Sequence, residues 1–461
     1  MQNFWDSSVW GTINLVGVLL LSLLLANILK KTLKYLRESL IPTSVLGGII
    51  LLLIVVVYQL ITGGESFLDT EFFGGNGSAT AETLTYHCLA LGFIATVFKP
   101  EGAKMNKERT RDIFNTGVTT VSTYLLQGIV GLGITLVWAL INSDFFAASG
   151  LLLPFGYGQG TGQALNYGGI YEADYGFIGG KSFGLTIAAL GFLSASIGGV
   201  IHMNIMSRKG KIKRSYVEAA ERYNADDVQK SDEIPMNGSI DKLTVQLGFV
   251  FMAYFITYLC LFFVGKLVPG LQSVLYGFNF LFGVMIATAI NAILVRLRRH
   301  KAIKKEYINS FLMKRISGFF FDLMIVAGIA AIKISVLKSY WWIMLILGLA
   351  GAAVTYIYNR VIAKTLFKKY SEEQFMAMYG MLTGTASTGI ILLREIDNEF
   401  KTPVAENLVY QNFPAIVFGF PIMLLAAMAP DQPLIVWGIL LGLFAMLNII
   451  LFRNQIFGKK R

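Results

Sequence analysis

The chain has 461 residues, of which 55% are apolar and only 15% are charged. This composition excludes an ordinary soluble globular protein and predicts a polytopic membrane protein embedded in a lipid bilayer. The formal net charge of +11 comes from short basic clusters between apolar segments, a pattern that indicates membrane topology, so we expect no nucleic-acid partner. Two cysteines and three histidines offer no basis for a disulfide framework or a histidine metal site.

Eleven apolar segments have the length of a membrane crossing or come close to it. A bilayer core about 30 Å thick takes roughly 20 helical residues. In chain order the segments cover 9–29, 41–62, 83–98, 113–142, 182–206, 242–264, 277–296, 316–337, 339–359, 404–429 and 433–452. We therefore predict an all-helical polytopic membrane protein with eleven crossings, of which the third is the shortest.

Basic residues follow every odd-numbered segment. The connection 63–82, after the second segment, instead holds four acidic residues and no lysine or arginine. Because basic loops stay in the cytoplasm, we expect the N-terminus outside and the C-terminus in the cytoplasm. The expected location is the cytoplasmic (inner) membrane.

One pattern, Tyr-Gly-x-x-Thr-Gly-x-Ala, occurs at Tyr157–Ala164 and again 222 residues later at Tyr379–Ala386. The same offset carries the fourth segment onto the ninth and the fifth onto the tenth. Each half then has five crossings, an odd number, so the second half is inverted relative to the first. The predicted divisions are a first repeat at 1–206, a cytoplasmic linker at 207–241, a second repeat at 242–430, and an additional helix with a basic tail at 431–461.

Each glycine-rich segment must return to the side of the membrane from which it enters. We predict two re-entrant hairpins, at about 146–170 and about 373–393, whose tips approach the midplane and share one site. Glycines leave peptide groups outside helices, and hydrocarbon does not tolerate such groups, so a polar cavity is expected. Free N–H groups at a half-helix start suit a carboxylate, whereas carbonyls and hydroxyls suit Na⁺. The alternative is that small residues here only let helices pack closely.

The candidate binding residues share a polar or glycine side chain at these tips or in the tenth segment. They are Gly158, Gln159, Gly160, Thr161, Gly162, Gln163, Asn166, Thr383, Gly384, Thr385, Ser387, Thr388 and Asn412. Thr161 and Thr383, at equivalent pattern positions, are the candidate Na⁺ ligands.

Two ionisable residues are further candidates because charge within a span is costly. Asp322, which is predicted to share a face of the eighth segment with Lys333, is either an ion or proton site or a wetted interfacial residue. Arg394 either pairs with a substrate carboxylate or anchors the chain at the cytoplasmic surface.

Four motifs carry a family resemblance: Ile41–Gly48, the glycine-rich Gly158–Gly162, the pair Gly198-Gly199 before a basic turn, and Tyr379–Gly389. With these the chain resembles the bacterial sodium/glutamate symporter family over about residues 9–430. The resemblance implies a homodimer that imports glutamate with Na⁺ as the coupling ion. It also implies an elevator mechanism, in which a hairpin-bearing domain moves against a dimerising scaffold.

We therefore expect a secondary active transporter, and not an enzyme, that couples glutamate import to Na⁺. A Na⁺-coupled transporter of another carboxylate or hydroxycarboxylate, and a cation/proton exchanger, are the alternatives. An exchanger should hold adjacent buried carboxylates, whereas Asp322 is alone in its segment. The spans contain no HExxH motif and no Ser/His arrangement that would favour an enzyme, and no ring of filter segments that would favour a channel.

Overall fold

The computed structural model describes residues 3–64, 66–98, 107–212, 228, 232–236, 239–268, 272–277, 279–397 and 401–456. Over these residues the ordered elements are helices, and the only strand-like feature is an isolated bridge between Glu233 and Glu306. The all-helical prediction is thus confirmed. Most of the predicted linker 207–241 lies outside the described residues.

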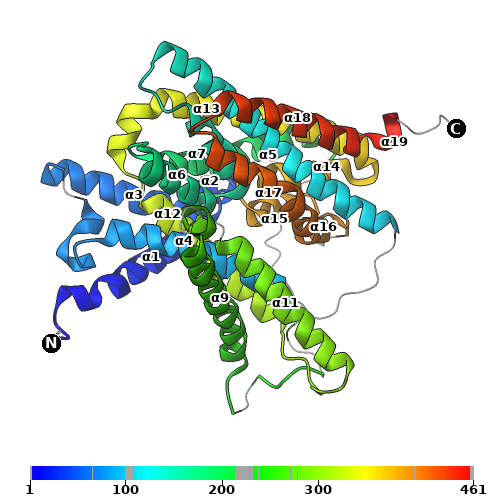
Figure 1. Ribbon diagram of the computed structural model, residues 1–461, viewed down its shortest axis with the longest axis horizontal. Helices are drawn as coiled ribbons and strands as arrows, with labels where there is room; N and C mark the ends of the chain where they lie inside the picture. Colours follow the sequence, from blue (N-terminus) through cyan, green and yellow to red (C-terminus); the bar gives the residue numbers. More distant parts are fainter. Residues whose placement is uncertain are drawn as a thin grey trace. The chain divides into compact units, whose positions relative to one another are not determined.

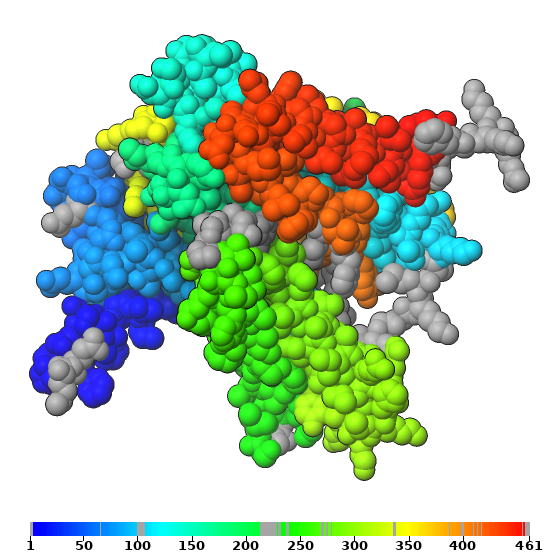
Figure 2. All heavy atoms as spheres, viewed as in Figure 1, coloured from blue at the N-terminus to red at the C-terminus, as the bar shows by residue number. Residues whose placement is uncertain are grey.

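Eight helices in the described part of the chain are long and apolar enough to cross a membrane. They are α1 (Ser7–Thr32), α3 (Thr43–Thr62), α5 (Lys107–Ile141), α7 (Gly180–Arg208), α9 (Lys242–Leu267), α11 (Asn279–Arg299), α13 (Ile334–Leu366) and α18 (Pro433–Leu451). Many of their outward side chains are large and apolar; on α18, red in Figure 2, these include Leu434, Ile435 and Ile449. Exposed apolar surface of this extent suits lipid contact, as expected of a multi-pass membrane protein.

The eighth predicted crossing ends earlier than expected. Its helix, α12, covers Ser310–Ala330, and Lys333 instead precedes α13. The prediction that Asp322 and Lys333 share one helix face is therefore wrong. The backbone N–H of Lys333 donates to Ser182 Oγ at 3.0 Å, so a tertiary contact takes the donor that a continued α12 would use.

The tenth predicted crossing is broken into α16 (Val404–Tyr410) and α17 (Asn412–Met428). Gln411 lies between the two helices. Pro414 follows in the first turn of α17, and it has no N–H to donate to the carbonyl of Tyr410. The third predicted crossing, α4 (Gly77–Val97), forms a helix but is not among the eight.

The chain divides into two compact units. The first comprises Met1–Glu82, Met105–Val217 and Ile325–Arg461, and the second comprises Thr83–Lys104 and Glu218–Met324. Both glycine-rich segments belong to the first unit.

Helix α5 lies inside the first unit, packed against α13, α17 and α18 (Figure 1). Small residues allow this close packing. A Cβ added at Gly131 of α5, or at Gly150 in the 3₁₀ turn η3 (Ala147–Leu151), would collide with the backbone of the other. The first glycine-rich segment is therefore held directly against the α5 backbone.

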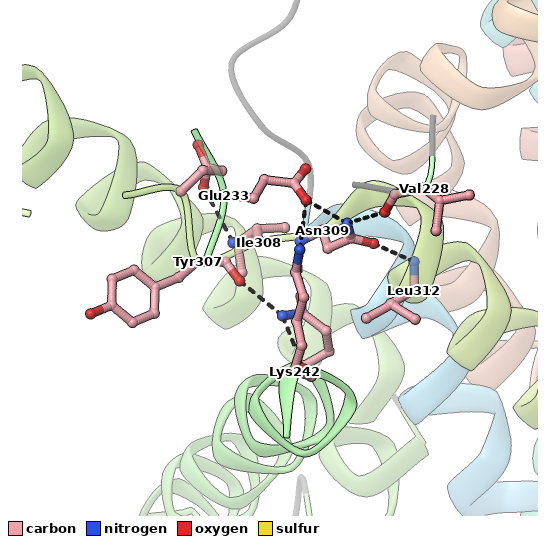
Figure 3. A network of polar contacts seen from close by, with 9 residues as sticks. Val228, Glu233, Lys242, Tyr307, Ile308, Asn309 and Leu312 are labelled. Carbon is pink, nitrogen blue, oxygen red and sulfur yellow. Dashed lines mark hydrogen bonds and ion pairs between the residues drawn. The ribbon is translucent and has the colours of Figure 1, made fainter. Parts of the chain in front are cut away.

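In the second unit, α9 packs against α10 (Gln272–Gly277) and α11, and a buried polar network fixes its start. Lys242 is fully buried, and its Nζ lies 2.7 Å from Glu233 Oε2. Asn309 Nδ2 donates to the same carboxylate oxygen at 2.6 Å and to the Val228 carbonyl at 2.9 Å (Figure 3). The end of the predicted linker is thereby attached both to α9 and to the residues that precede α12.

Candidate functional site

Each glycine-rich segment consists of two helical pieces separated by a short break. In the first segment, the π-helical turn η4 (Pro154–Gly158) is followed by Gln159 and Gly160, and then by α6 (Thr161–Tyr175). Gly160 has φ of +81°, a backbone conformation that glycine adopts without steric cost.

In the second segment, α14 (Ser371–Leu382) and α15 (Ala386–Arg394) are separated by Thr383, Gly384 and Thr385. Thr385 caps α15, because its Oγ1 accepts from the backbone N–H of Thr388 at 3.4 Å.

The two breaks lie against each other. A Cβ added at Gly160 would sit 3.3 Å from Thr385 Cγ2 and 3.6 Å from the Gly384 carbonyl oxygen. Gly191 of α7 packs against both segments. A Cβ added there would lie 2.5 Å from the Thr383 carbonyl oxygen and 3.1 Å from Tyr157 Cδ2. The structure therefore brings together segments more than 200 residues apart, and we call this place the junction.

Both α6 and α15 begin at the junction. The first intrahelical bond of α6 is donated by Ala164 to Gly160, and that of α15 by Gly389 to Thr385. N–H groups earlier in each helix have no intrahelical partner, and each helix start carries about half a positive charge. Two such helix starts at one place form a donor-rich, electropositive environment.

Three polar side-chain atoms beside the first break are buried and have no hydrogen-bond partner: Gln159 Nε2, Thr161 Oγ1 and Gln163 Nε2. Thr161 and Gln163 are 0% and 1% exposed. Leaving such a group unpaired costs about 1–3 kcal/mol, so a ligand or ordered water is expected to meet it. All three can donate a hydrogen bond, the two amide nitrogens and the Thr161 hydroxyl alike, which adds to the suitability of the junction for a carboxylate.

Thr161 and Thr383 hold the same position in the repeated pattern but differ in local structure. Thr161 is the first residue of α6, whereas Thr383 follows the last residue of α14. The Thr383 hydroxyl donates to the Tyr379 carbonyl at 2.6 Å, so only its lone pairs remain for a ligand. An oxygen of this kind suits a cation better than an anion.

Several other predicted residues pair locally. Asn166 Nδ2 donates to Gln163 Oε1 at 3.1 Å, and the hydroxyls of Thr385 and Thr388 are 3.3 Å apart. The Gly158 carbonyl accepts from the Tyr124 hydroxyl at 3.1 Å. Gly162 lies in the first turn of α6, and the side chain of Ser387 lies outside the described part of the structure.

The remaining predicted residues lie at other places. Arg394 ends α15, about 12 Å along the axis from the helix start. Asn412 begins α17, where its Oδ1 accepts from Gln411 Nε2 at 2.9 Å. Asp322 is exposed on α12 and belongs to the second unit.

Gln127 of α5 was missed by the sequence analysis. It is fully buried, and its Nε2 donates to the Leu382 carbonyl and to Thr355 Oγ1, both at 2.8 Å. Its Oε1 has no partner and would lie 3.2 Å from a Cβ added at Gly158. Gln127 therefore contacts both glycine-rich segments. An amide inside an apolar segment is costly, and that cost is the feature by which the sequence could have revealed it.

No protein-family model, curated protein or solved structure matches the chain. Its function is therefore inferred from its own geometry. The fold and the site define a multi-pass helical membrane protein in which two broken helical segments meet at a buried polar junction.

Proposed function

We propose that the protein is a secondary transporter that imports glutamate together with Na⁺, and that the junction is its binding site. One observation carries the proposal: the starts of α6 and α15 meet beside the unpartnered donors of Gln159 and Gln163. This donor set favours a carboxylate, and the resemblance to sodium/glutamate symporters supplies glutamate as the particular one.

The helix boundaries support the inverted repeat and its re-entrant hairpins. A shift of 222 residues carries α5 to 329–363, beside the observed Ile334–Leu366 of α13. The same shift carries α7 to 402–430, beside α16 and α17. The intervening helices α6 and α15 have 15 and 9 residues, fewer than the roughly 20 that a crossing needs.

Coupling between glutamate binding and Na⁺ binding is expected because the proposed site lacks charged side chains. The junction residues Gln159, Thr161, Gln163 and Thr385 are all uncharged, so a bound carboxylate has no side-chain cation to pair with there. Burying an unpaired charge is expensive, which favours simultaneous binding of Na⁺ to nearby oxygens such as Thr383 Oγ1. If glutamate and Na⁺ together bind the outward-facing state more tightly than the inward-facing state, or the reverse, their binding shifts the equilibrium between these two states.

The remaining features of the proposal come from the charge pattern and the resemblance. The basic clusters favour an external N-terminus and a cytoplasmic C-terminus in the inner membrane. The first unit, which carries both broken segments, takes the role of the moving domain of an elevator, and two chains form the homodimer.

Uptake of labelled glutamate into proteoliposomes tests the proposal. An inward Na⁺ gradient should drive accumulation, and collapsing the gradient should abolish it. Unlabelled glutamate and a hydroxycarboxylate serve as competitors. Stronger inhibition by the hydroxycarboxylate than by glutamate would favour the alternative substrate, and uptake indifferent to the gradient would overturn the coupling.

A further inference from the structure

One buried face of α5 is lined by threonines whose hydroxyl protons are donated to backbone carbonyls of the same helix. These residues recur every three or four positions, so they share a side of the helix. Each hydroxyl donates to the backbone carbonyl four residues earlier, at 2.7 to 3.0 Å, in Thr116, Thr119, Thr120 and Thr123. Their oxygens therefore have only lone pairs left for further partners.

Three buried amides face the same side, and their orientation is fixed by what their nitrogens contact. Gln127 Nε2 donates to the Leu382 carbonyl at 2.8 Å, and Asn359 Nδ2 donates to the Thr355 carbonyl at 2.9 Å. Backbone carbonyls cannot donate, so the nitrogen of each amide must be the atom that faces them.

The third amide is fixed in the same way. Gln374 Nε2 lies 3.2 Å from Thr116 Oγ1, whose only proton is donated to the Asp112 carbonyl. The oxygen of each amide is consequently the atom left over. Gln127 Oε1, Asn359 Oδ1 and Gln374 Oε1 are all buried without a hydrogen-bond partner.

We call these threonine hydroxyls and amide oxygens the acceptor seam. They lie where α5 meets α13 and α14, since Asn359 Nδ2 lies 3.3 Å from Thr123 Oγ1 and Gln374 Nε2 lies 3.2 Å from Thr116 Oγ1. From Thr116 to Gln127 the acceptor seam follows eleven residues of α5, roughly 16 Å. One end reaches the junction, where Gln127 contacts Leu382. At the other end the Tyr370 hydroxyl donates to the carboxylate of Asp112.

The donor at that end stays protonated. Burial and the bond to Asp112 raise the pKa of Tyr370 well above its usual value, so the phenol remains neutral at physiological pH. The carboxylate of Asp112 is the charged group at that end of the acceptor seam.

We propose that the acceptor seam is a binding site for a monovalent cation, separate from the carboxylate site at the junction. Amide and hydroxyl oxygens replace the hydration shell of such a cation, as carbonyl oxygens do in ion-selective filters. An anion would meet only lone pairs. The inference rests on the proposed function only for naming the cation as Na⁺; cation binding itself needs no glutamate.

The experiment measures binding of radiolabelled Na⁺ to the purified full-length protein without glutamate, with choline as the competing inert cation. Asn359→Leu removes an unpartnered oxygen of the acceptor seam and should weaken Na⁺ binding at least tenfold. Asn359→Asp places an oxygen against the Thr355 carbonyl, so its carboxyl group must carry a proton there; it keeps the oxygen of the acceptor seam and should bind Na⁺ about as tightly as the wild type. Thr123→Ser keeps the hydroxyl and should bind normally.

Asn448→Leu is the matched control. It makes the same chemical change in α18, at an amide whose Oδ1 already accepts from the Tyr358 hydroxyl at 2.9 Å. It should leave Na⁺ affinity unchanged. Thermal unfolding of each variant in choline identifies any loss of affinity that arises from misfolding. If Asn359→Leu does not fold, Gln374→Met, which removes another unpartnered oxygen of the acceptor seam, should weaken Na⁺ binding in its place.

Two results would overturn the inference. One is Na⁺ affinity in folded Asn359→Leu equal to that of the wild type, and the other is absence of Na⁺ binding in the wild type, which would mean that water alone fills the seam. The outcome is independent of transport. Seam-dependent Na⁺ binding without glutamate uptake would support this inference and contradict the proposed function.

Discussion

At the scale of single residues, identical sequence produces different chemistry at Thr161 and Thr383. The repeated pattern predicts equivalent roles, yet the Thr161 hydroxyl is unpartnered while that of Thr383 is bound to its own helix. Thr161 can therefore donate to a carboxylate, and Thr383 can only accept. The sequence could not reveal this difference, because it depends on whether the threonine begins the second helix of its segment, as Thr161 does, or directly follows the first, as Thr383 does.

Thr161→Val should reduce glutamate uptake about tenfold, since one hydrogen bond to a charged ligand contributes about 1.5 kcal/mol. Uptake in proteoliposomes at fixed Na⁺ is the measurement, and Thr161→Ser, which restores the hydroxyl, is the control. Equal uptake in the Val and Ser variants would show that the hydroxyl makes no contact with substrate.

Thr383→Val should mainly lower the apparent affinity for Na⁺. The expected result is a rise of severalfold in the Na⁺ concentration that gives half-maximal uptake, with glutamate affinity at saturating Na⁺ little changed. Kinetics over a range of Na⁺ concentrations separate the two effects. A variant that lost glutamate affinity at saturating Na⁺ would not be explained by a cation ligand.

At the scale of elements, the breaks and their anchors position the site. The start of α14 is held by an ion pair: Arg360 of α13 donates twice to Glu372, both at 2.6 Å, and His202 of α7 lies 3.2 Å from the same carboxylate. Both glycine-rich segments are interrupted within the ranges that the sequence predicts for re-entrant hairpins, and the hairpins themselves stay a prediction. Their contact at Gly160 and Thr385, and the end of α12 before Lys333, depend on tertiary contacts between distant residues and could not be read from local pattern.

Gly160→Ala should abolish uptake. The added Cβ would strain a positive φ and press against Thr385, so the two helix starts would separate. Gly63→Ala is a control for a positive φ alone, because Gly63 has φ of +78° in the αL region and nothing lies within 4 Å of an added Cβ. The control should lose about 1 kcal/mol of stability and retain uptake; uptake by Gly160→Ala at the same level would contradict the role of the junction.

Arg360→Gln should destabilise the protein by about 3 kcal/mol, since it leaves a largely buried carboxylate without its cation. Lys369→Gln is the comparison, because it breaks the exposed pair with Glu108 and should leave stability almost unchanged. Thermal unfolding in detergent compares the two. A similar, small loss in both variants would mean that Arg360 does not anchor α14.

At the scale of the whole molecule, the site lies within one compact unit, and the second unit has its own polar anchor. Both broken segments and the acceptor seam belong to the first unit, whereas the Glu233–Lys242 pair belongs to the second. Composition alone predicted the multi-pass, all-helical class, because apolar segments of membrane length leave few alternatives. The division into units was not predicted, since it joins residues from both halves of the chain.

Lys242→Met should lower thermal stability by about 3 to 5 kcal/mol, because Glu233 would stay buried without a cation. Lys242→Met combined with Glu233→Gln should recover part of this loss. Thermal unfolding of the single and double variants checks the coupling. Strictly additive losses would contradict an ion pair between the two side chains.

The central claim, that carboxylate binds where α6 and α15 begin, is tested most directly by an experimental structure determined with glutamate and NaCl. The account predicts a carboxylate of glutamate at the junction, with its oxygens about 2.7–3.2 Å from backbone N–H groups in the first turn of α6 or α15. Density for glutamate anywhere outside the junction, with the two helix starts unoccupied, would contradict it.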